Sequence, residues 1–278
     1  MISYEKQKIQ LDGVPNARQL GGYIVSGGKR IKNNVILRTG ALFAASVEVC
    51  TELSEKYRVS DIIDFRMEQE VSVMPDPDIM GAKYHHISVL NDIPMTKEDF
   101  EIYKELIKCG DMVIKYKKLY GTGIDISPDK VYRSLVFSDM GKEGYRRFFD
   151  ILLKKSENSA ILFHCTQGKD RTGMAAALLL AALGADRQTI TEDYMMTNTA
   201  CGSMLDKIKL EMQNENVDKA VLDFALFLES VDKSFIEAIF DIMDKEYGSV
   251  VGYLEKELGL TADAIEDLRK LYLEDNKE

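Results

Sequence analysis

Short apolar runs alternate with segments of helical spacing along the first two thirds of the chain. Strands are predicted where such a run is brief and bounded by polar or turn residues, over 35–38, 59–65, 83–90 and 160–163. The segment 23–31 predicts a hairpin, because Gly27 and Gly28 separate two apolar stretches. Helical spacing predicts helices over 47–57, 131–137 and 145–153, and over 100–120, where Gly110 favours two separate helices.

Almost everything after residue 171 has helical spacing. The predicted helices cover 172–183, 187–197, 203–213, 217–228, 234–247, 250–258 and 262–273. Asp186, Ser249 and Thr261 are suited to cap three of them. The helix that begins at 172 is rich in Ala and Leu on all sides, which predicts that it is buried against a sheet.

Strands that alternate with helices before a helical region predict the α/β class. We expect a central, mostly parallel sheet of four or five strands flanked by helices, with a helical C-terminal region. The 278 residues show no internal repeat or low-complexity linker, so we expect a single domain over 1–278.

The most informative segment joins the predicted strand 160–163 to the helix at 172. Residues 164–173 are His-Cys-Thr-Gln-Gly-Lys-Asp-Arg-Thr-Gly, so five residues separate the thiol of Cys165 from the guanidinium of Arg171. Such a loop can bind a dianion through its N–H groups, the helix N-terminus and the arginine. The same field stabilises a thiolate, so the segment predicts phosphoryl transfer through a covalent cysteine intermediate.

This segment resembles the signature of the cysteine-based protein tyrosine phosphatases, His-Cys-five residues-Arg followed by Ser or Thr. The resemblance implies that Cys165 is the nucleophile and Arg171 the phosphate clamp. It implies that the Thr172 hydroxyl bonds the thiolate and helps it leave, and that His164 braces the loop. Gly168 permits backbone conformations that a residue with a Cβ resists.

The inner residues of the loop indicate which group within this family the chain resembles. The run Gly-Lys-Asp-Arg-Thr-Gly at 168–173 is similar to bacterial phosphatases that act on phosphotyrosine and, in some members, on phosphoserine, phosphothreonine and phosphoinositides. Thr166, Gln167, Gly168 and Lys169 are therefore expected to bind the substrate, with phosphate or vanadate as ligands of the loop.

Blocks before the loop, 16–23, 37–42 and 62–66, and blocks after it, 193–198, 247–253 and 258–260, are similar to segments of the same bacterial group. The first three imply that Arg66 and Asp64 take part in substrate binding and that Arg18 and Arg38 support the site. Gln19 stands where the group has Asp, which removes an acidic partner from a nearby arginine.

The general acid is not fixed by these motifs, because many family members carry it on a Trp-Pro-Asp loop and this chain has no Trp. Asp170 is the first candidate, since it lies in the loop where the myotubularin-like lipid phosphatases also hold an aspartate. The alternative is that Asp170 bonds Arg66 or the loop and only maintains its geometry. Asp64 is a third option for the acid, although a role in orienting an arginine is the first expectation for it. Asp76 and Asp129, beside prolines, are expected to form turns and are the next candidates if Asp170 is not the acid.

Lys169 bears on the class of substrate. It adds charge that phosphotyrosine does not need but that an inositol ring with several phosphates would use. A phosphorylated protein is the first expectation, and a phosphoinositide or inositol phosphate the alternative. An inert phosphate-binding module would normally lack the nucleophile or the clamp, and a rhodanese-type sulfurtransferase would not need the Arg-Thr-Gly continuation.

Residues from about 201 to 232 are expected to form a helical lid, because in relatives a helical pair from this region can cover the active site. Met204 and Met212 suit an adaptable contact, although core filling is the commoner role of methionine. A lid would shield the thiolate from oxidation.

Composition narrows the partners and the kinds of site. The formal charge of −10 argues against nucleic acid. Four cysteines at irregular spacing form neither a disulfide framework nor a metal-ligand pattern. His85 and His86 are adjacent on a predicted strand and point to opposite faces. We therefore expect no metal and no cofactor.

The N-terminus has no apolar run of the signal-peptide type. The longest apolar stretch, 174–182, is too short to span a bilayer. We expect a cytoplasmic protein without stable membrane insertion, with export independent of such a segment as the alternative.

Overall fold

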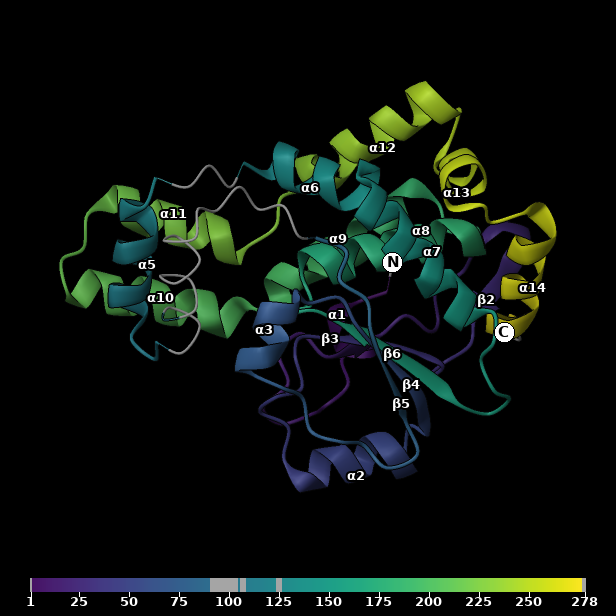
Figure 1. The fold of residues 1–278 in the computed structure, drawn as a ribbon, viewed down its shortest axis with the longest axis horizontal. Coiled ribbons are helices and arrows are strands. Elements are labelled where there is room, and N and C mark those ends of the chain that lie inside the picture. Colours follow the sequence, from purple (N-terminus) through teal and green to yellow (C-terminus); the bar gives the residue numbers. More distant parts are fainter. Residues whose placement is uncertain (1, 91–104, 106–108, 124–126, 277–278) are drawn as a thin grey trace.

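The computed structural model describes residues 2–90, 105, 109–123 and 127–276. Its main sheet has the strand order β1-β3-β6-β4-β5 (Figure 1). The strands are β1 (Arg18–Gln19), β3 (Ile36–Thr39), β6 (Ala160–His164), β4 (Val59–Asp64) and β5 (Lys83–His86). β3, β6, β4 and β5 run parallel, and β1 pairs antiparallel with β3. The predicted α/β class and mostly parallel sheet are confirmed.

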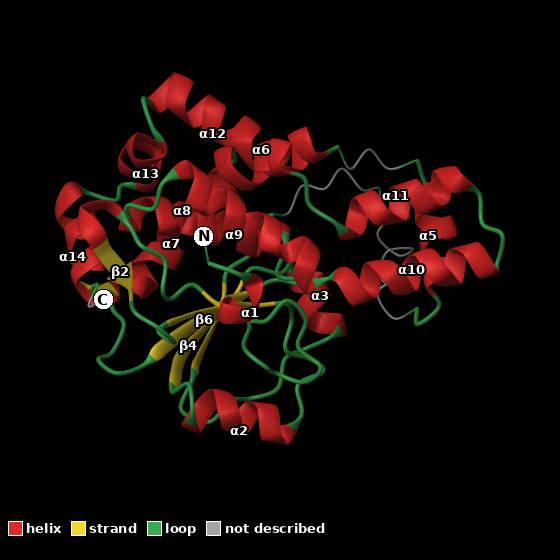
Figure 2. Cartoon of the chain, turned by 180° about the vertical axis from the view of Figure 1, so that it is seen from behind, coloured by secondary structure: helices red, strands yellow, loops and turns green. Residues whose placement is uncertain are grey.

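Side chains on the central strand β6 alternate between two apolar cores. Ala160 and Leu162 pack with helix α2 (Val47–Glu55), whereas Ile161 and Phe163 pack with the helices of the opposite face. Figure 2 shows α2 on one side of the sheet and α8 (Asp170–Leu183) on the other. Every residue of α8 from Thr172 onward is buried, as its composition predicts.

Further helices of the described residues lie around the sheet and on its C-terminal side. They are α1 (Tyr4–Gln7), α6 (Pro128–Phe137), α7 (Asp139–Leu152), α9 (Arg187–Ala200), α12 (Lys233–Tyr247), α13 (Val250–Leu258) and α14 (Ala262–Tyr272). Asp186, Ser249 and Thr261 accept capping hydrogen bonds at the starts of α9, α13 and α14, as predicted. Each helix of the described residues is too short or too polar to cross a lipid bilayer.

Within the described part of the chain, three helices form a separate group at one side of the molecule (Figure 1). They are α5 (Met112–Gly121), α10 (Gly202–Asn214) and α11 (Lys219–Glu229). Their shared apolar core contains Tyr116, Ile208, Met212, Val221 and Ala225. Of the predicted helical segment 100–120, residues 100–104 and 106–108 lie outside the described part of the chain.

Several short elements were not predicted, because they are too short to show a period. They are α1, β1, α3 (Glu68–Val73) and β7 (Leu273–Asp275), which pairs with β2 (Lys29–Ile31). The predicted strand 83–90 ends at His86. The predicted turn is present: Gly27 and Gly28, in the 3₁₀ turn η1 (Ser26–Gly28), have φ of 74° and 70°. The peptide N–H of Val25 bonds to Lys29 across this turn.

Candidate active site

The predicted phosphate loop lies at the carboxyl edge of the sheet. Cys165 follows the last residue of β6, and Arg171 is the second residue of α8. The ends of β3 and β4 flank the loop, since both strands run parallel to β6. This is the edge where open α/β sheets bind their ligands. Cys165 is buried there, with 3% of its surface exposed.

Three carbonyl groups of the loop are held from outside. Thr166 O accepts from the Ala41 N–H at 3.0 Å, Gln167 O from Asn16 Nδ2 at 3.2 Å, and Gly168 O from Arg38 Nη2 at 2.9 Å. In a planar trans peptide the N–H points opposite to the carbonyl. The N–H groups of residues 167, 168 and 169 are therefore directed to the inner side of the loop, where they can bind an anion.

Gly168 is required by the backbone at this turn. Its φ is 67°, and a Cβ at this position would lie 2.4 Å from the carbonyl oxygen of Thr39. A residue with a side chain would both strain the loop and push it away from β3.

A buried ionic cluster supports the loop from behind. Arg38 Nη1 lies 2.6 Å from Asp193 Oδ2, and Arg18 Nε lies 3.5 Å from Asp193 Oδ1. Burial and the charge of Arg18 lower the pKa of Arg38 to about 10, against the opposing charge of Asp193. Burial would raise the pKa of Asp193, but the two arginines lower it. Arg18 and Arg38 thus lie where support of the loop was expected, with Asp193 of α9 as the acidic partner that Gln19 does not supply.

Glu70 of α3 binds the predicted phosphate clamp. Arg171 Nη1 and Nη2 lie 2.5 and 3.0 Å from the two carboxylate oxygens of Glu70, which also accepts a hydrogen bond from Thr166 Oγ1. Burial would raise the pKa of Glu70, but the charge of Arg171 and these hydrogen bonds lower it to about 2. The carboxylate is therefore ionised at neutral pH and holds the guanidinium by two prongs.

Asp170 begins α8 and is held by a phenol. Tyr132 Oη donates a hydrogen bond of 2.5 Å to Asp170 Oδ1, and Tyr132 Oη lies 2.5 Å from Tyr194 Oη. Lys169 Nζ lies 3.5 Å from Asp170 Oδ2. About a third of the Asp170 side chain is exposed, 34%. Among the described contacts, the carboxylate is bound to these neighbours and not to Arg66, which was one alternative.

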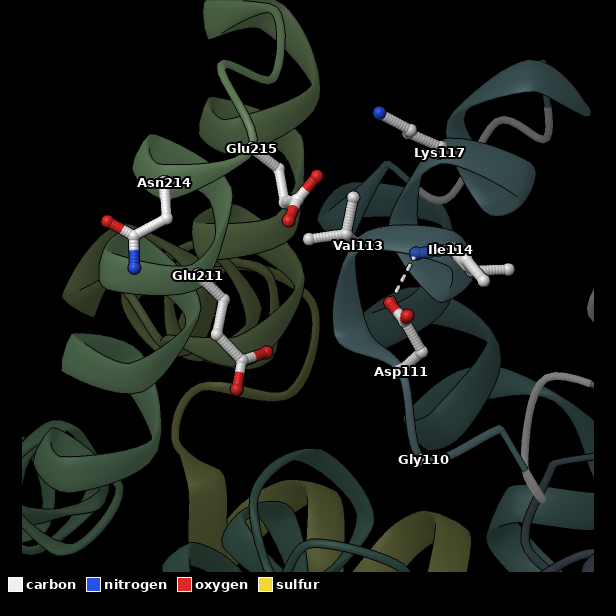
Figure 3. A pocket seen from close by; sticks show the side chains of 8 residues that line it. All are labelled: Gly110, Asp111, Val113, Ile114, Lys117, Glu211, Asn214 and Glu215. Atoms are coloured by element: carbon white, nitrogen blue, oxygen red, sulfur yellow. Dashed lines mark hydrogen bonds between the residues drawn. The ribbon is translucent and has the colours of Figure 1, made fainter.

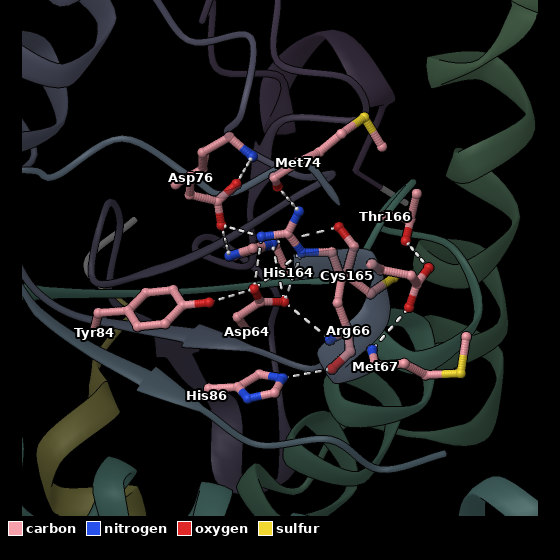
Figure 4. A network of polar contacts seen from close by, with 12 residues as sticks. Asp64, Arg66, Met67, Met74, Asp76, Tyr84, His86, His164, Cys165 and Thr166 are labelled. Carbon is pink, nitrogen blue, oxygen red and sulfur yellow. Dashed lines mark hydrogen bonds and ion pairs between the residues drawn. The ribbon is translucent and has the colours of Figure 1, made fainter. Parts of the chain in front are cut away.

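Arg66 and Asp64 lie in a buried network behind the loop (Figure 4). Arg66 Nη2 lies 2.7 Å from Asp64 Oδ2 and 2.6 Å from Asp76 Oδ2. His164 Nε2 lies 3.2 Å from the same oxygen of Asp76, and Tyr84 Oη donates to Asp64 at 2.6 Å. Burial would raise the pKa of Asp64, but His164 and Arg66 lower it well below its usual range.

The positions of Arg66 and Asp64 in this network do not fit the expectation that they bind the substrate. Arg66 and Asp64 have no exposed surface, so they support the loop from below and do not face a substrate directly. Asp64 contacts the Arg66 guanidinium, the position from which it can orient the arginine, and His164 lies where it can brace the loop. Asp76 contacts both Arg66 and His164, and its carboxylate also accepts a hydrogen bond from the Leu42 N–H at 2.8 Å. Asp129 lies elsewhere, on the exposed first turn of α6 beside Arg133.

Asp64, Asp76 and His164 bring ligand-type atoms within 4.8 Å of one another. A metal is not needed to neutralise these carboxylates, because the Arg66 guanidinium already contacts both. His85 and His86 have different partners, Asp61 and the Arg66 carbonyl group. They therefore do not form one site.

The remaining loop side chains reach the end of α11. Gln167 Nε2 donates to Glu229, which also accepts from Tyr116 Oη. Lys169 Nζ donates to the carbonyl groups of Leu228 and Ser230. A lysine ammonium is stabilised at the negative end of a helix. Lys169 is accordingly buried, with 7% of its surface exposed.

The comparison with known protein families agrees with this geometry. Residues 9–274 match the tyrosine phosphatase family. The chain belongs to this family. The phosphatase is 26% identical over 254 residues to a Cupriavidus necator protein provisionally named a tyrosine-protein phosphatase, covering 91% of this chain and 85% of that protein.

Two further relatives match shorter parts of this phosphatase. It is 29% identical over 121 residues to the triple specificity protein phosphatase PtpB of Mycobacterium tuberculosis, covering 41% of this chain and 44% of PtpB. It is 29% identical over 124 residues to a tyrosine-protein phosphatase of Nostoc commune, covering 41% of this chain and 39% of that protein.

A pocket of about 700 Å³ lies away from the phosphate loop, between α5 and the end of α10 (Figure 3). Asp111, Glu211 and Glu215 line it together with Lys117. The Asp111 carboxylate is already used, because it accepts from the Ile114 N–H at the start of α5. The pocket is thus a feature of the three-helix group and does not extend the phosphatase site.

Proposed function

We propose that this phosphatase hydrolyses phosphomonoesters, with phosphotyrosine in proteins as the first substrate, through a phosphate bound covalently to Cys165. The observation that carries the proposal is the loop itself. Cys165 lies at its base, three N–H groups are directed inward, and Arg171 stands at the helix start. A thiolate, a nest of N–H donors and a two-pronged cation are what an in-line transfer to sulfur requires.

The reaction then has two steps. The Cys165 thiolate forms a bond to phosphorus while the bond from phosphorus to the ester oxygen breaks, and that oxygen leaves as it gains a proton. Water next attacks the phosphocysteine, and the thiolate leaves. Thr172 Oγ1 is buried without a hydrogen-bond partner among the described residues, so its hydroxyl can donate a hydrogen bond to the departing thiolate without losing its proton. Glu70 keeps Arg171 oriented in both steps.

Asp170 is proposed to give the proton to the leaving oxygen and to take one from the water afterwards. Asp170→Asn is expected to lower kcat for phenyl or tyrosyl phosphate by about 10² to 10⁴, the size of general acid catalysis. An activated ester such as p-nitrophenyl phosphate should lose far less, because its leaving group needs no proton. Steady-state rates on both esters provide the test. Equal losses would remove Asp170 from the acid role.

The state of Lys169 supports a monophosphate as the first substrate. Its ammonium is occupied by the end of α11, so a second phosphate could use Lys169 only after α11 moves away. With α11 in this position the loop offers Lys169 to no second phosphate, which suits a monophosphate such as phosphotyrosine; opening of the segment 201–232 would free Lys169. The name of PtpB, a triple specificity phosphatase, supports a broader range, and phosphoinositides remain the alternative. Rates on phosphotyrosine, phosphoserine and phosphothreonine peptides should be compared with rates on mono- and polyphosphorylated phosphoinositides. Faster turnover of the polyphosphorylated phosphoinositides would make these lipids the first substrate in place of phosphotyrosine.

The segment 201–232 is proposed to act as a lid, with α10 and α11 in the closed position. Glu229 holds the lid in this position, since it is 4% exposed and accepts hydrogen bonds from Gln167 of the loop and Tyr116 of α5. Losing a hydrogen bond to a charged group costs about 1.5–3 kcal/mol. Glu229→Ala should therefore raise the open population and the rate of Cys165 inactivation by peroxide by about tenfold or more.

Asp223→Ala is the matched control for the lid. Asp223 lies on the same helix, on an exposed face where it pairs with Lys219. Its removal should leave the peroxide rate unchanged. An identical inactivation rate in Glu229→Ala and the parent protein would contradict the lid.

A further inference from the structure

We propose that Tyr132 and Tyr194 are positioning residues for proton transfer by Asp170, Tyr132 directly and Tyr194 through Tyr132. The proposal rests on the general acid role of Asp170 given above. It concerns two side chains from helices other than α8, and neither belongs to the phosphate loop.

The contact places a fixed donor on one oxygen of the carboxylate. Tyr132 Oη donates to Asp170 Oδ1 at 2.5 Å. Tyr132 and Tyr194 are almost wholly buried, at 2% and 1% exposed, while the Asp170 side chain is 34% exposed. A buried phenol therefore fixes Oδ1, while the Asp170 side chain as a whole keeps about a third of its surface exposed. Oδ2, which lies on the Lys169 side at 3.5 Å, is then the oxygen that can exchange a proton with a leaving group.

The direction of the hydrogen bonds follows from counting protons. Each phenol has one hydrogen, and that of Tyr132 points to Asp170. Tyr194 must therefore donate to Tyr132 Oη across their 2.5 Å contact. A hydroxyl that accepts one hydrogen bond donates the next one more strongly. The chain Tyr194 to Tyr132 to Asp170 is thus polarised toward the carboxylate.

Packing and charge keep this chain in place. The two rings meet edge to face, with centroids 6.4 Å apart, and Phe235 of α12 packs against Tyr132 at 5.8 Å. Burial raises the pKa of both phenols, and the negative charge of Asp170 adds to the effect. Both phenols therefore stay protonated at neutral pH. Without them the Asp170 side chain could rotate, and proton transfer is sensitive to such misplacement.

The test compares leaving groups in tyrosine variants that keep the ring. In Tyr132→Phe, kcat for phenyl phosphate should fall about tenfold more than kcat for p-nitrophenyl phosphate, since a hydrogen bond to a charged group is lost. Tyr194→Phe should show the same selectivity with a smaller size, about threefold. This selectivity is a readout that a loss of stability alone would not change.

Tyr253→Phe is the matched control. Tyr253 is also buried and its Oη donates at 2.5 Å to the Val136 carbonyl group, on the same helix α6 that carries Tyr132. Its loss should change the two rates by equal factors. In an Asp170→Asn background, Tyr132→Phe should add no further selectivity, because the group that it positions is gone.

The outcomes separate this inference from the proposed function. If Asp170→Asn is selective but neither tyrosine variant is, the positioning role is wrong and the general acid stands. If Asp170→Asn itself is not selective, both the general acid role of Asp170 and the positioning role of the tyrosines are wrong. If Tyr132→Phe does not fold, the selectivity of Tyr194→Phe decides.

Discussion

Cys165→Ser is expected to abolish turnover, lowering kcat by at least about 10³, while phosphate binding at the loop is largely kept. A serine hydroxyl is a poor nucleophile at neutral pH, but it preserves the shape of the loop. Stopped assays on a phosphotyrosine peptide, with phosphate affinity measured by calorimetry, provide the check. Cys50→Ser, which removes a thiol from α2 outside the loop, should keep the parent rate. Turnover by Cys165→Ser above a few per cent would argue against the cysteine path.

Arg171→Lys is expected to lower kcat/KM by about 10² to 10³ or more, the cost of removing a donor to transition-state charge. The ammonium of a lysine cannot reproduce a planar fork. It would lose the two contacts with Glu70 at 2.5 and 3.0 Å and the two-pronged grip on the phosphate. Arg133→Lys, on the exposed face of α6, is the control and should keep the parent rate. Near-full activity in Arg171→Lys would remove this residue from the clamp role.

The elements that carry the site were predictable because their signals are local. The strand 160–163, the loop and the buried helix after it are contiguous, so one stretch of sequence contains nucleophile, clamp and their scaffold. The parallel strands that end beside the loop are apolar runs of ordinary length. The alternation of Ala160 and Leu162 with Ile161 and Phe163 then follows from strand geometry.

The residues that hold these groups could not be predicted in the same way. Glu70 sits in a six-residue helix without a readable period, and it meets Arg171 across 101 positions of sequence. Tyr132 and Glu229 likewise come from helices whose apolar pattern indicates burial but not the partner of a polar group. Asp193 lies in a block that resembles the bacterial group, but the resemblance does not indicate its two arginine partners. The signal that could have indicated such residues is a polar side chain on the apolar face of a predicted helix, because a buried polar group requires a hydrogen-bond partner.

The position of Arg66 shows the same limit. The sequence placed it correctly at the end of a strand beside the loop, with Asp64 to orient it. Its Nη2 contacts with Asp64 and Asp76 turn the side chain into the interior. The sequence predicts a turn at Asp76 and gives no sign of this contact with Arg66. Which way a strand-end arginine points depends on a carboxylate ten residues away, and periodicity does not report that.

The most direct test of the central claim is to trap the phosphocysteine. The protein is mixed with an excess of an activated phosphate ester and quenched within a turnover, and its mass is measured whole and after digestion. We expect one added phosphoryl group, located on the peptide that contains Cys165 and absent from Cys165→Ser. Product release with no phosphorylated protein at any quench time, or a phosphoryl group on another residue, would contradict it.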